Sequence, residues 1–305
     1  MTGTAVAGVG LVTGWGDGVS ALPADARAAA AGRRVVALPR PPLAGDRFRR
    51  ATRECLLGVA AVEALLGDAA LAREDIRGSE TALVYVTAGG YGAANRAFVV
   101  AGTADNRSVV AGTARPPVSE GGPKQVRGGS VASSTHSVLS RPGAASGALH
   151  FPYTAPSAVP GEVAIEFELT GAYEILIGGA AAAIDALWRA TELLARGRCA
   201  RALVLAVETF AECEDLYARG RWLVRSPLVE SAACALLIPG RLAPTFAPAA
   251  APSPLETLAR ARTGETLACA PLIALALARA AGDAGRVSLT GEWRGRRAGL
   301  TLETR

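Results

Sequence analysis

Lysine, histidine and large aromatic side chains are scarce in this sequence of 305 residues. Lys124 is the only lysine, there are two histidines, and aromatic residues make up 5% of the chain. With so few histidines, a zinc site is not expected. The five cysteines form no CxxC pair and stand in apolar or helical contexts, which is typical of small buried hydrophobic residues. We therefore predict no metal and no cofactor.

The sequence also has no long hydrophobic run. A membrane-spanning helix needs about 20 apolar residues, whereas the longest apolar stretch, 267–278, has twelve. The N-terminal segment MTGTAVAGVG has no basic region of the kind that opens a secretory signal. We expect a cytoplasmic protein with no membrane partner. The 50% hydrophobic content, mostly Ala, Leu and Val, is enough for a sizeable core of small residues.

The formal charge of +5 invites a nucleic-acid partner, but the charge is unevenly placed. Residues 101–150 hold five basic and two acidic residues, which accounts for +3 of it. The rest of the chain shows no basic stripe with interleaved aromatic residues, so no nucleic-acid partner is predicted. The sequence also contains no GxGxxG, GxxxxGK[ST] or GxSxG motif, which excludes the common signatures of dinucleotide binding, phosphate binding and serine hydrolysis.

Hydrophobic patterning predicts an α/β protein with a buried parallel or mixed sheet. Runs rich in β-branched residues predict strands, and apolar residues at helical spacing predict helices. The expected strands are 4–12, 81–88, 173–177, 201–210, 232–238, 286–290 and 298–303; the expected helices are 48–66, 180–196 and 271–281, and 163–167 is predicted as a helix or a short strand.

The pattern breaks between about residues 102 and 146, where Gly, Ser, Pro, Thr and Arg dominate without apolar periodicity. Loops of this length are rare inside compact domains. This composition predicts a disordered insertion, with a functional lid as the alternative.

Several segments resemble the β-ketoacyl synthase family of the thiolase superfamily. GVGLVTGWGDGV (8–19) is similar to the opening strand of the family, ALVYVTAGGYG (82–92) to its second strand, and SAACALLIP (231–239) to the strand after the active-site loop. GETLACAP (264–271) resembles the GHTxGAAG motif of the family. The resemblance implies a thiolase-like layered α/β fold with mixed sheets and an abbreviated second half.

The strongest resemblance surrounds the position of the family's nucleophile. In ketosynthases a strand ends in a sharp turn that exposes a cysteine at a helix N-terminus, where the helix dipole lowers the thiol pKa. Two counts, one forward from Gly171 and one back from the helix end at Arg196, place this position at Ala180. Gly178 and Gly179 precede it. Glu265 stands where the family has a histidine, and the HGTGT segment and the catalytic lysine are missing.

An alanine cannot be acylated, so the resemblance implies a pseudoenzyme similar to a chain length factor. Such subunits form heterodimers with an active ketosynthase in type II fatty-acid, polyketide or aryl-polyene-like biosynthesis. Family dimers pair at the strand that here contains Tyr173, Ile175 and Ile177 and ends at Gly178 and Gly179. An acyl carrier protein is a further candidate partner.

Two alternatives remain. One is an acyl-thioester enzyme with altered chemistry, a decarboxylase or acyltransferase, in which Glu265 serves as a base or Cys269 as a nucleophile. The other is a degenerate relic that does not fold stably. For the domain organisation we expect an N-terminal thiolase-like half over 1–240, including the insertion, and a remnant of the C-terminal half over 241–305.

Overall fold

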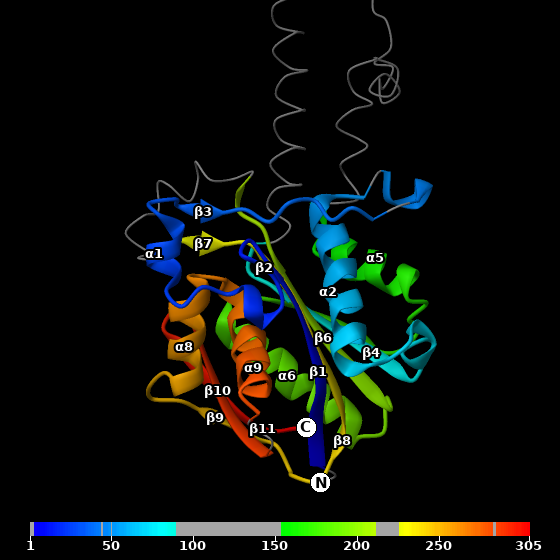
Figure 1. Ribbon diagram of the computed structural model, residues 1–305. Coiled ribbons are helices and arrows are strands. Elements are labelled where there is room, and N and C mark those ends of the chain that lie inside the picture. Colours follow the sequence, from blue (N-terminus) through cyan, green and yellow to red (C-terminus); the bar gives the residue numbers. More distant parts are fainter. Residues whose placement is uncertain (1–2, 44, 50, 90–153, 212–225, 283–284) are drawn as a thin grey trace, which may run out of the picture.

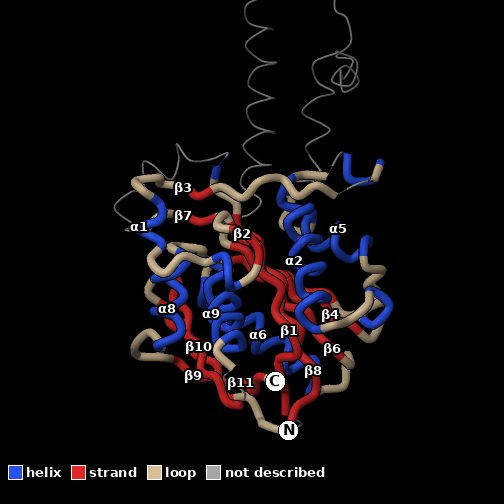
Figure 2. The backbone as a smooth tube through the Cα atoms, in the orientation of Figure 1, coloured by secondary structure: helices blue, strands red, loops and turns tan. Residues whose placement is uncertain are grey.

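The computed structural model describes residues 3–43, 45–49, 51–89, 154–211, 226–282 and 285–305. Within these residues, a curled mixed sheet runs through the molecule with helices on both faces (Figures 1 and 2). The predicted insertion at 102–146 lies outside the described residues, as do both histidines and Cys213. The strands are β1 (Gly3–Thr13), β2 (Gly16–Asp17), β3 (Val35–Val36), β4 (Thr81–Thr87), β5 (Tyr173–Ile177), β6 (Arg201–Glu208), β7 (Leu228–Val229), β8 (Ser231–Gly240), β9 (Thr245–Pro248), β10 (Gly285–Trp293) and β11 (Arg296–Thr304).

The large sheet has the strand order β10-β11-β1-β8-β6-β4-β5, with β2 paired to β1 and β9 paired to β11. Strands β5, β4 and β6 are parallel, β8 is antiparallel to β6 and β1, and β11 is parallel to β1. The mixed sheet predicted from the sequence is confirmed. β3 and β7 form a separate two-stranded sheet.

Alternate residues of the central strands face two different helical layers, as the two-residue period of a strand requires. In β6, Leu203, Leu205 and Val207 pack with α2 (Arg53–Ala69) and α5 (Ala158–Glu166). Ala202, Val204 and Ala206 pack with α6 (Ala180–Ala195) and α9 (Ala270–Ala280). The sheet is therefore buried on both faces, which explains why its strands read as continuous apolar runs.

The remaining helices are short or lie at the side of the sheet: α1 (Ala26–Ala30), α8 (Pro254–Thr263) and the 3-10 turns η1 (Val19–Ala21), η2 (Asp46–Arg49), η3 (Arg73–Asp75) and η6 (Leu267–Cys269). Thr52 and Ser253 begin α2 and α8 as N-caps, since each side chain accepts a hydrogen bond from the backbone N–H three residues later.

Most predicted elements are present, with shifted ends. The segment predicted as a helix or a short strand at 163–167 belongs to helix α5, and the helix predicted from residue 48 begins at Arg53. The predicted strand 201–210 ends at Glu208. Strand β9 and helix α8 lie in a stretch for which no element was predicted.

The boundary expected at residue 240 coincides with the end of β8. Beyond it, β9, β10 and β11 do not build a sheet of their own, because they extend the large sheet next to β1. The division into 1–240 and 241–305 stays a prediction.

Candidate functional site

Ala180 is the first residue of α6, directly after a tight turn that follows β5. Gly178 donates a backbone hydrogen bond to the carbonyl of Thr87, 2.8 Å away, which ties the turn to the end of β4. The carbonyl of Gly179 accepts from the N–H groups of Ala182 and Ala183. The side chain of Ala180 is a buried methyl group and offers no nucleophile.

The C-terminal hairpin covers this turn. The indole of Trp293, at the end of β10, lies so close to Gly179 that a methyl group added there would overlap its ring. A Cβ atom added at Gly291 would lie 2.5 Å from the carbonyl oxygen of Ala180. The hairpin therefore seals the N-terminus of α6 with an aromatic ring.

Glu208 ends the neighbouring strand β6 and is fully buried. Its carboxyl group accepts hydrogen bonds from the backbone N–H groups of Ala88, Gly89 and Ala268, at 2.6, 3.0 and 3.3 Å. Burial raises the pKa of Glu208 to about 8, although these hydrogen bonds act in the opposite direction. One carboxyl group thus joins the ends of β4 and β6 to the segment that contains η6.

Cys269, the last residue of η6, is fully buried beside this carboxyl group. Its thiol donates to the carbonyl of Ser231 at 3.4 Å. Burial, and then the charge of Glu208, raise the pKa of the Cys269 thiol far above its ordinary value. The structure therefore places Cys269 in the core as a thiol, the environment of an inert cysteine.

Glu265 lies just before η6 and is partly exposed. Its carboxylate accepts from the backbone N–H of Leu267 at 3.1 Å and lies 4.0 Å from the guanidinium of Arg260. The backbone N–H of Val229 donates to the Glu265 carbonyl at 2.9 Å. The segment that follows, Leu267–Cys269, contacts α6 and the ends of β4 and β6, so the chain near Ala180 and the chain near Glu265 converge on one region.

Strand β5 forms one end of the large sheet, and among the described residues it has a neighbour, β4, on one side only. Tyr173 and Ile177, on this strand, are 42% and 52% exposed. Ile175, two residues from each, packs against the α2 and α5 layer. Within the described part of the chain, this edge therefore has no partner strand, and it carries two exposed apolar side chains.

Within the described part of the chain, no group of three or more His, Cys, Asp or Glu residues is arranged to hold a metal ion. No helix among those residues is long and apolar enough to span a bilayer.

Solved structures with this architecture cover the whole chain. The ishigamide ketosynthase/chain length factor aligns over 99% of both chains with a TM-score of 0.65 and 16% identity. The AntDE:AntF complex, a type II PKS acyl-carrier protein with its ketosynthase bound to the hexaketide, aligns over 100% of both chains with a TM-score of 0.69 and 11% identity. A ketosynthase (ApeO) in complex with its chain length factor (ApeC) from Xenorhabdus doucetiae aligns over 99% of both chains, with a TM-score of 0.53 and 11% identity.

The chain has the ketosynthase fold. The thiolase-like α/β fold implied by the sequence resemblance is thereby confirmed. No family profile matches the sequence, and no curated protein matches it.

Three residues of this ketosynthase fold had no role in the sequence analysis. They are Trp293, Glu208 and Glu230, none of which lies in a motif that the sequence analysis uses. Burial raises the pKa of Glu230, but a hydrogen bond from Arg53 and backbone N–H donors outweigh it, so the net pKa is lowered. A carboxylate at the end of an apolar strand, as Glu208 is in RALVLAVE, is the one pattern that could have pointed to a buried acid.

Proposed function

We propose that this chain is a non-catalytic, chain-length-factor-like subunit that forms a heterodimer with an active β-ketoacyl synthase. The observation that carries the proposal is the intact strand, turn and helix at Gly178 and Gly179 with alanine at the first position of α6. The turn geometry is kept, and the reactive atom is absent. Condensation needs an acylated nucleophile, which Ala180 cannot provide.

The exposed edge of β5 supports a location for the heterodimer interface. An exposed strand edge with apolar side chains favours pairing with another chain. We propose that Tyr173, Ile175 and Ile177, with the following Gly178 and Gly179, form the interface with the ketosynthase. We further propose that residues 1–240 correspond to the N-terminal thiolase-like half and 241–305 to a remnant of the second half.

The altered-chemistry alternative receives little support from its two candidate residues. Cys269 is fully buried and burial raises its pKa, and the described residues contain no histidine that could form a dyad with Glu265. The relic alternative predicts an unstable chain, whereas the described residues form a continuous core on both faces of the sheet.

The partner proposal extends to two further points. An acyl carrier protein is the proposed third component, since the similar AntDE:AntF complex contains one. The cytoplasm is the proposed location, and four buried free cysteines among the described residues, Cys55, Cys199, Cys234 and Cys269, are typical of a reducing compartment.

Co-expression with a candidate partner ketosynthase tests the proposal. We expect one complex with the mass of a heterodimer by light scattering, and ketosynthase activity that depends on the complex. Ile177→Lys places a charge at the β5 edge and is expected to separate the two chains. Leu258→Lys, at a 44% exposed position on α8, is the matched control that leaves the complex intact.

Two results would overturn the proposal. One is a ketosynthase that elutes separately and works equally well without this chain. The other is condensation catalysed by this chain alone, which would refute the non-catalytic assignment directly.

A further inference from the structure

A slot of about 440 Å³ lies along one edge of β1, between α2 and α9. Figure 1 shows β1 running between these two helices, with β2 near its upper end. Within the described residues, β11 pairs with β1 at positions 5 and 6, and β2 pairs with it at positions 12 and 13. The edge between these pairings, from Val9 to Leu11, has no neighbouring strand there, and both residues line the slot.

The backbone groups of Val9 and Leu11 point into this slot rather than toward β8. The Val9 N–H donates to Asp68 Oδ2 at 2.9 Å, and the Leu11 carbonyl accepts from the Gly18 N–H at 2.8 Å. In a strand, the N–H and C=O of one residue lie on the same side. The Val9 carbonyl and the Leu11 N–H therefore face the slot too, and among the described residues neither has a hydrogen-bond partner there.

These two free groups are buried, because Val9 is 6% exposed and Leu11 2%. A buried backbone group without a partner costs about as much free energy as a lost hydrogen bond. The slot therefore presents one acceptor and one donor, two residues apart on a rigid central strand, to whatever enters it.

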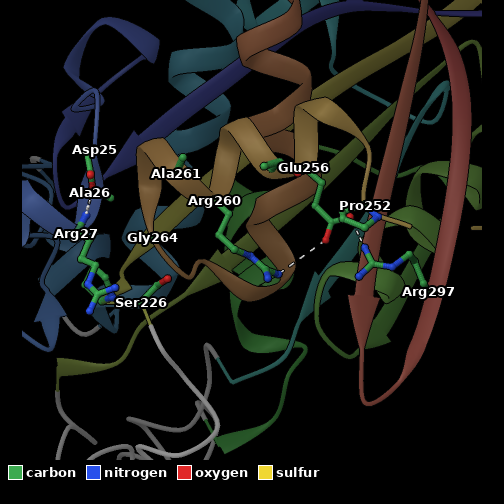
Figure 3. A pocket seen from close by; sticks show the side chains of 12 residues that line it. Asp25, Ala26, Arg27, Ser226, Pro252, Glu256, Arg260, Ala261, Gly264 and Arg297 are labelled. Carbon is green, nitrogen blue, oxygen red and sulfur yellow. Dashed lines mark hydrogen bonds and ion pairs between the residues drawn. The ribbon is translucent and has the colours of Figure 1, made fainter. Parts of the chain in front are cut away.

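A second hollow, between α1 and α8, differs because its charged groups are bonded to one another. Figure 3 shows the side chain of Arg260 turned toward Glu256. Arg297 donates to the same carboxylate at 2.6 Å, as does the Thr290 hydroxyl at 2.5 Å. The free polar groups beside β1 are therefore a feature of the slot and not of every hollow in the molecule.

We propose that the slot binds an extended peptide in which a small residue pairs with β1 and a basic residue follows it. In a parallel ladder, the residue opposite Gly10 donates its N–H to the Val9 carbonyl and accepts at its own carbonyl from the Leu11 N–H. One peptide residue thus satisfies both free groups. An antiparallel peptide would turn a further carbonyl toward the Val9 N–H, which Asp68 already holds.

The walls of the slot favour a small side chain. Residues opposite each other in a ladder project to the same face of the sheet. Gly10 faces α2, since a Cβ atom added there would lie 2.2 Å from the carbonyl oxygen of Ala61. The slot is lined on the α2 side by Ala64 and on the α9 side by Ala276 and Ala280. Methyl groups on both walls leave room for the main chain of the peptide and for short side chains.

Asp17 accounts for the basic residue. A peptide parallel to β1 runs from the Asp68 end of the slot toward Asp17, which also lines it. Asp68 is paired with Arg279 at 3.3 Å, whereas the Asp17 carboxylate makes no hydrogen bond or ion pair within the described part of the chain. Three strands separate β1 from β5, so the slot stands independently of the proposed function.

NMR titration of the ¹⁵N-labelled full chain with acetyl-Ala-Arg-amide tests the proposal. We expect the Leu11 amide proton to move downfield and, at saturation, to exchange with solvent at least about tenfold more slowly, because it donates to the peptide. Acetyl-Pro-Arg-amide lacks the N–H that reaches the Val9 carbonyl and should bind about tenfold more weakly. Acetyl-Ala-Glu-amide should also bind more weakly than the arginine peptide, and Asp17→Asn should reduce that difference.

Ala64→Leu fills the slot and should abolish the shift at Leu11. Ala261→Leu, at an exposed position of α8, is the matched control and should leave binding unchanged. The comparison of the alanine and proline peptides uses the native chain, so it decides the matter even where Ala64→Leu is unstable. An unmoved Leu11 amide, or equal affinity for the two peptides, would overturn the proposal.

Discussion

The indole ring of Trp293 covers the backbone of Gly179, the residue immediately before the alanine that replaces the expected nucleophile. The two residues are far apart in the chain and meet because the β10–β11 hairpin folds against the N-terminal turn of α6. The absent side chain at Gly179 makes this approach possible, since any Cβ atom would enter the ring. The side chain at position 180 is therefore a methyl group without a nucleophile, and an aromatic ring lies over the turn that precedes it.

Gly179→Ala should destabilise the chain by about 1–3 kcal/mol, because the added methyl group overpacks against the indole ring. In a Trp293→Ala background the same change should cost under about 1 kcal/mol, since the obstacle is gone. Urea unfolding of the four proteins measures the coupling. Gly67→Ala is the control, an exposed helical glycine with open space, and should raise stability by up to about 1 kcal/mol. Equal costs of Gly179→Ala in both backgrounds would contradict the contact.

A thiol restored at the family position should remain shielded. Ala180→Cys is expected to react slowly with iodoacetamide, because the position is buried beneath the hairpin. Adding Trp293→Ala should speed its alkylation at least about tenfold, by exposing the start of α6, where the helix dipole favours the thiolate. Peptide mass spectrometry distinguishes this residue from the native cysteines, and Leu258→Cys gives the rate for an exposed thiol. Rapid alkylation of the single variant would show that Trp293 does not close the turn.

Glu208 should make stability fall as pH rises. Its folded pKa of about 8 exceeds the unfolded value of 4.5, so the folded state keeps a proton that the unfolded state releases between those pH values. The contribution of Glu208 is complete below about pH 4.5 and declines toward pH 8 by roughly 1.4 kcal/mol per pH unit. Glu208→Gln cannot titrate and should lack this slope. Denaturant unfolding from pH 5 to pH 8 compares the two proteins, and parallel profiles would contradict the raised pKa.

The ion pair between Arg53 and Glu230 should matter more than the exposed pairs. Arg53 Nη2 lies 2.8 Å from Glu230 Oε1, and the same carboxylate accepts from the N–H groups of Leu38, Phe210 and Ala211. Arg53→Met leaves a buried charge without its partner and should cost about 3–5 kcal/mol. Arg77→Met, which removes an exposed pair with Glu168, should cost under about 1 kcal/mol.

The pH dependence of that pair has the opposite sign to that of Glu208. The pKa of Glu230 is lowered, so its contribution is present above the unfolded value and is lost as pH falls through the folded value. The difference in unfolding free energy between the native chain and Arg53→Met should therefore shrink in acid. A constant difference down to pH 3 would contradict this.

The local sequence pattern was sufficient to predict the strands that are buried on both faces and the helices that have one apolar face. β4, β6 and β8 are continuous runs of small and β-branched residues, and α6 repeats apolar residues at helical spacing up to Gly197. The sequence pattern does not predict β9 and α8, because Thr245–Pro248 is mostly exposed and α8 is rich in charged residues, so neither carries a strong apolar period.

The candidate site likewise has one part that the sequence predicts and another that depends on the tertiary structure. Sequence order alone placed Gly178, Gly179 and Ala180 between a strand and a helix, where the structure has them. It could not reveal Trp293, because that contact depends on long-range strand pairing that brings the C-terminal hairpin beside β1. Nor could it separate Glu208 from exposed carboxylates, since burial depends on what packs around the end of β6.

The sequence by itself therefore determined that this chain has no thiol at the expected position, because covalent chemistry depends only on which side chain is present. Tertiary structure alone decided that the turn is covered, that Glu208 is buried and that β5 lies at the edge of the described sheet. Each of these depends on distances between residues far apart in the chain, and such distances are set by packing rather than by local pattern.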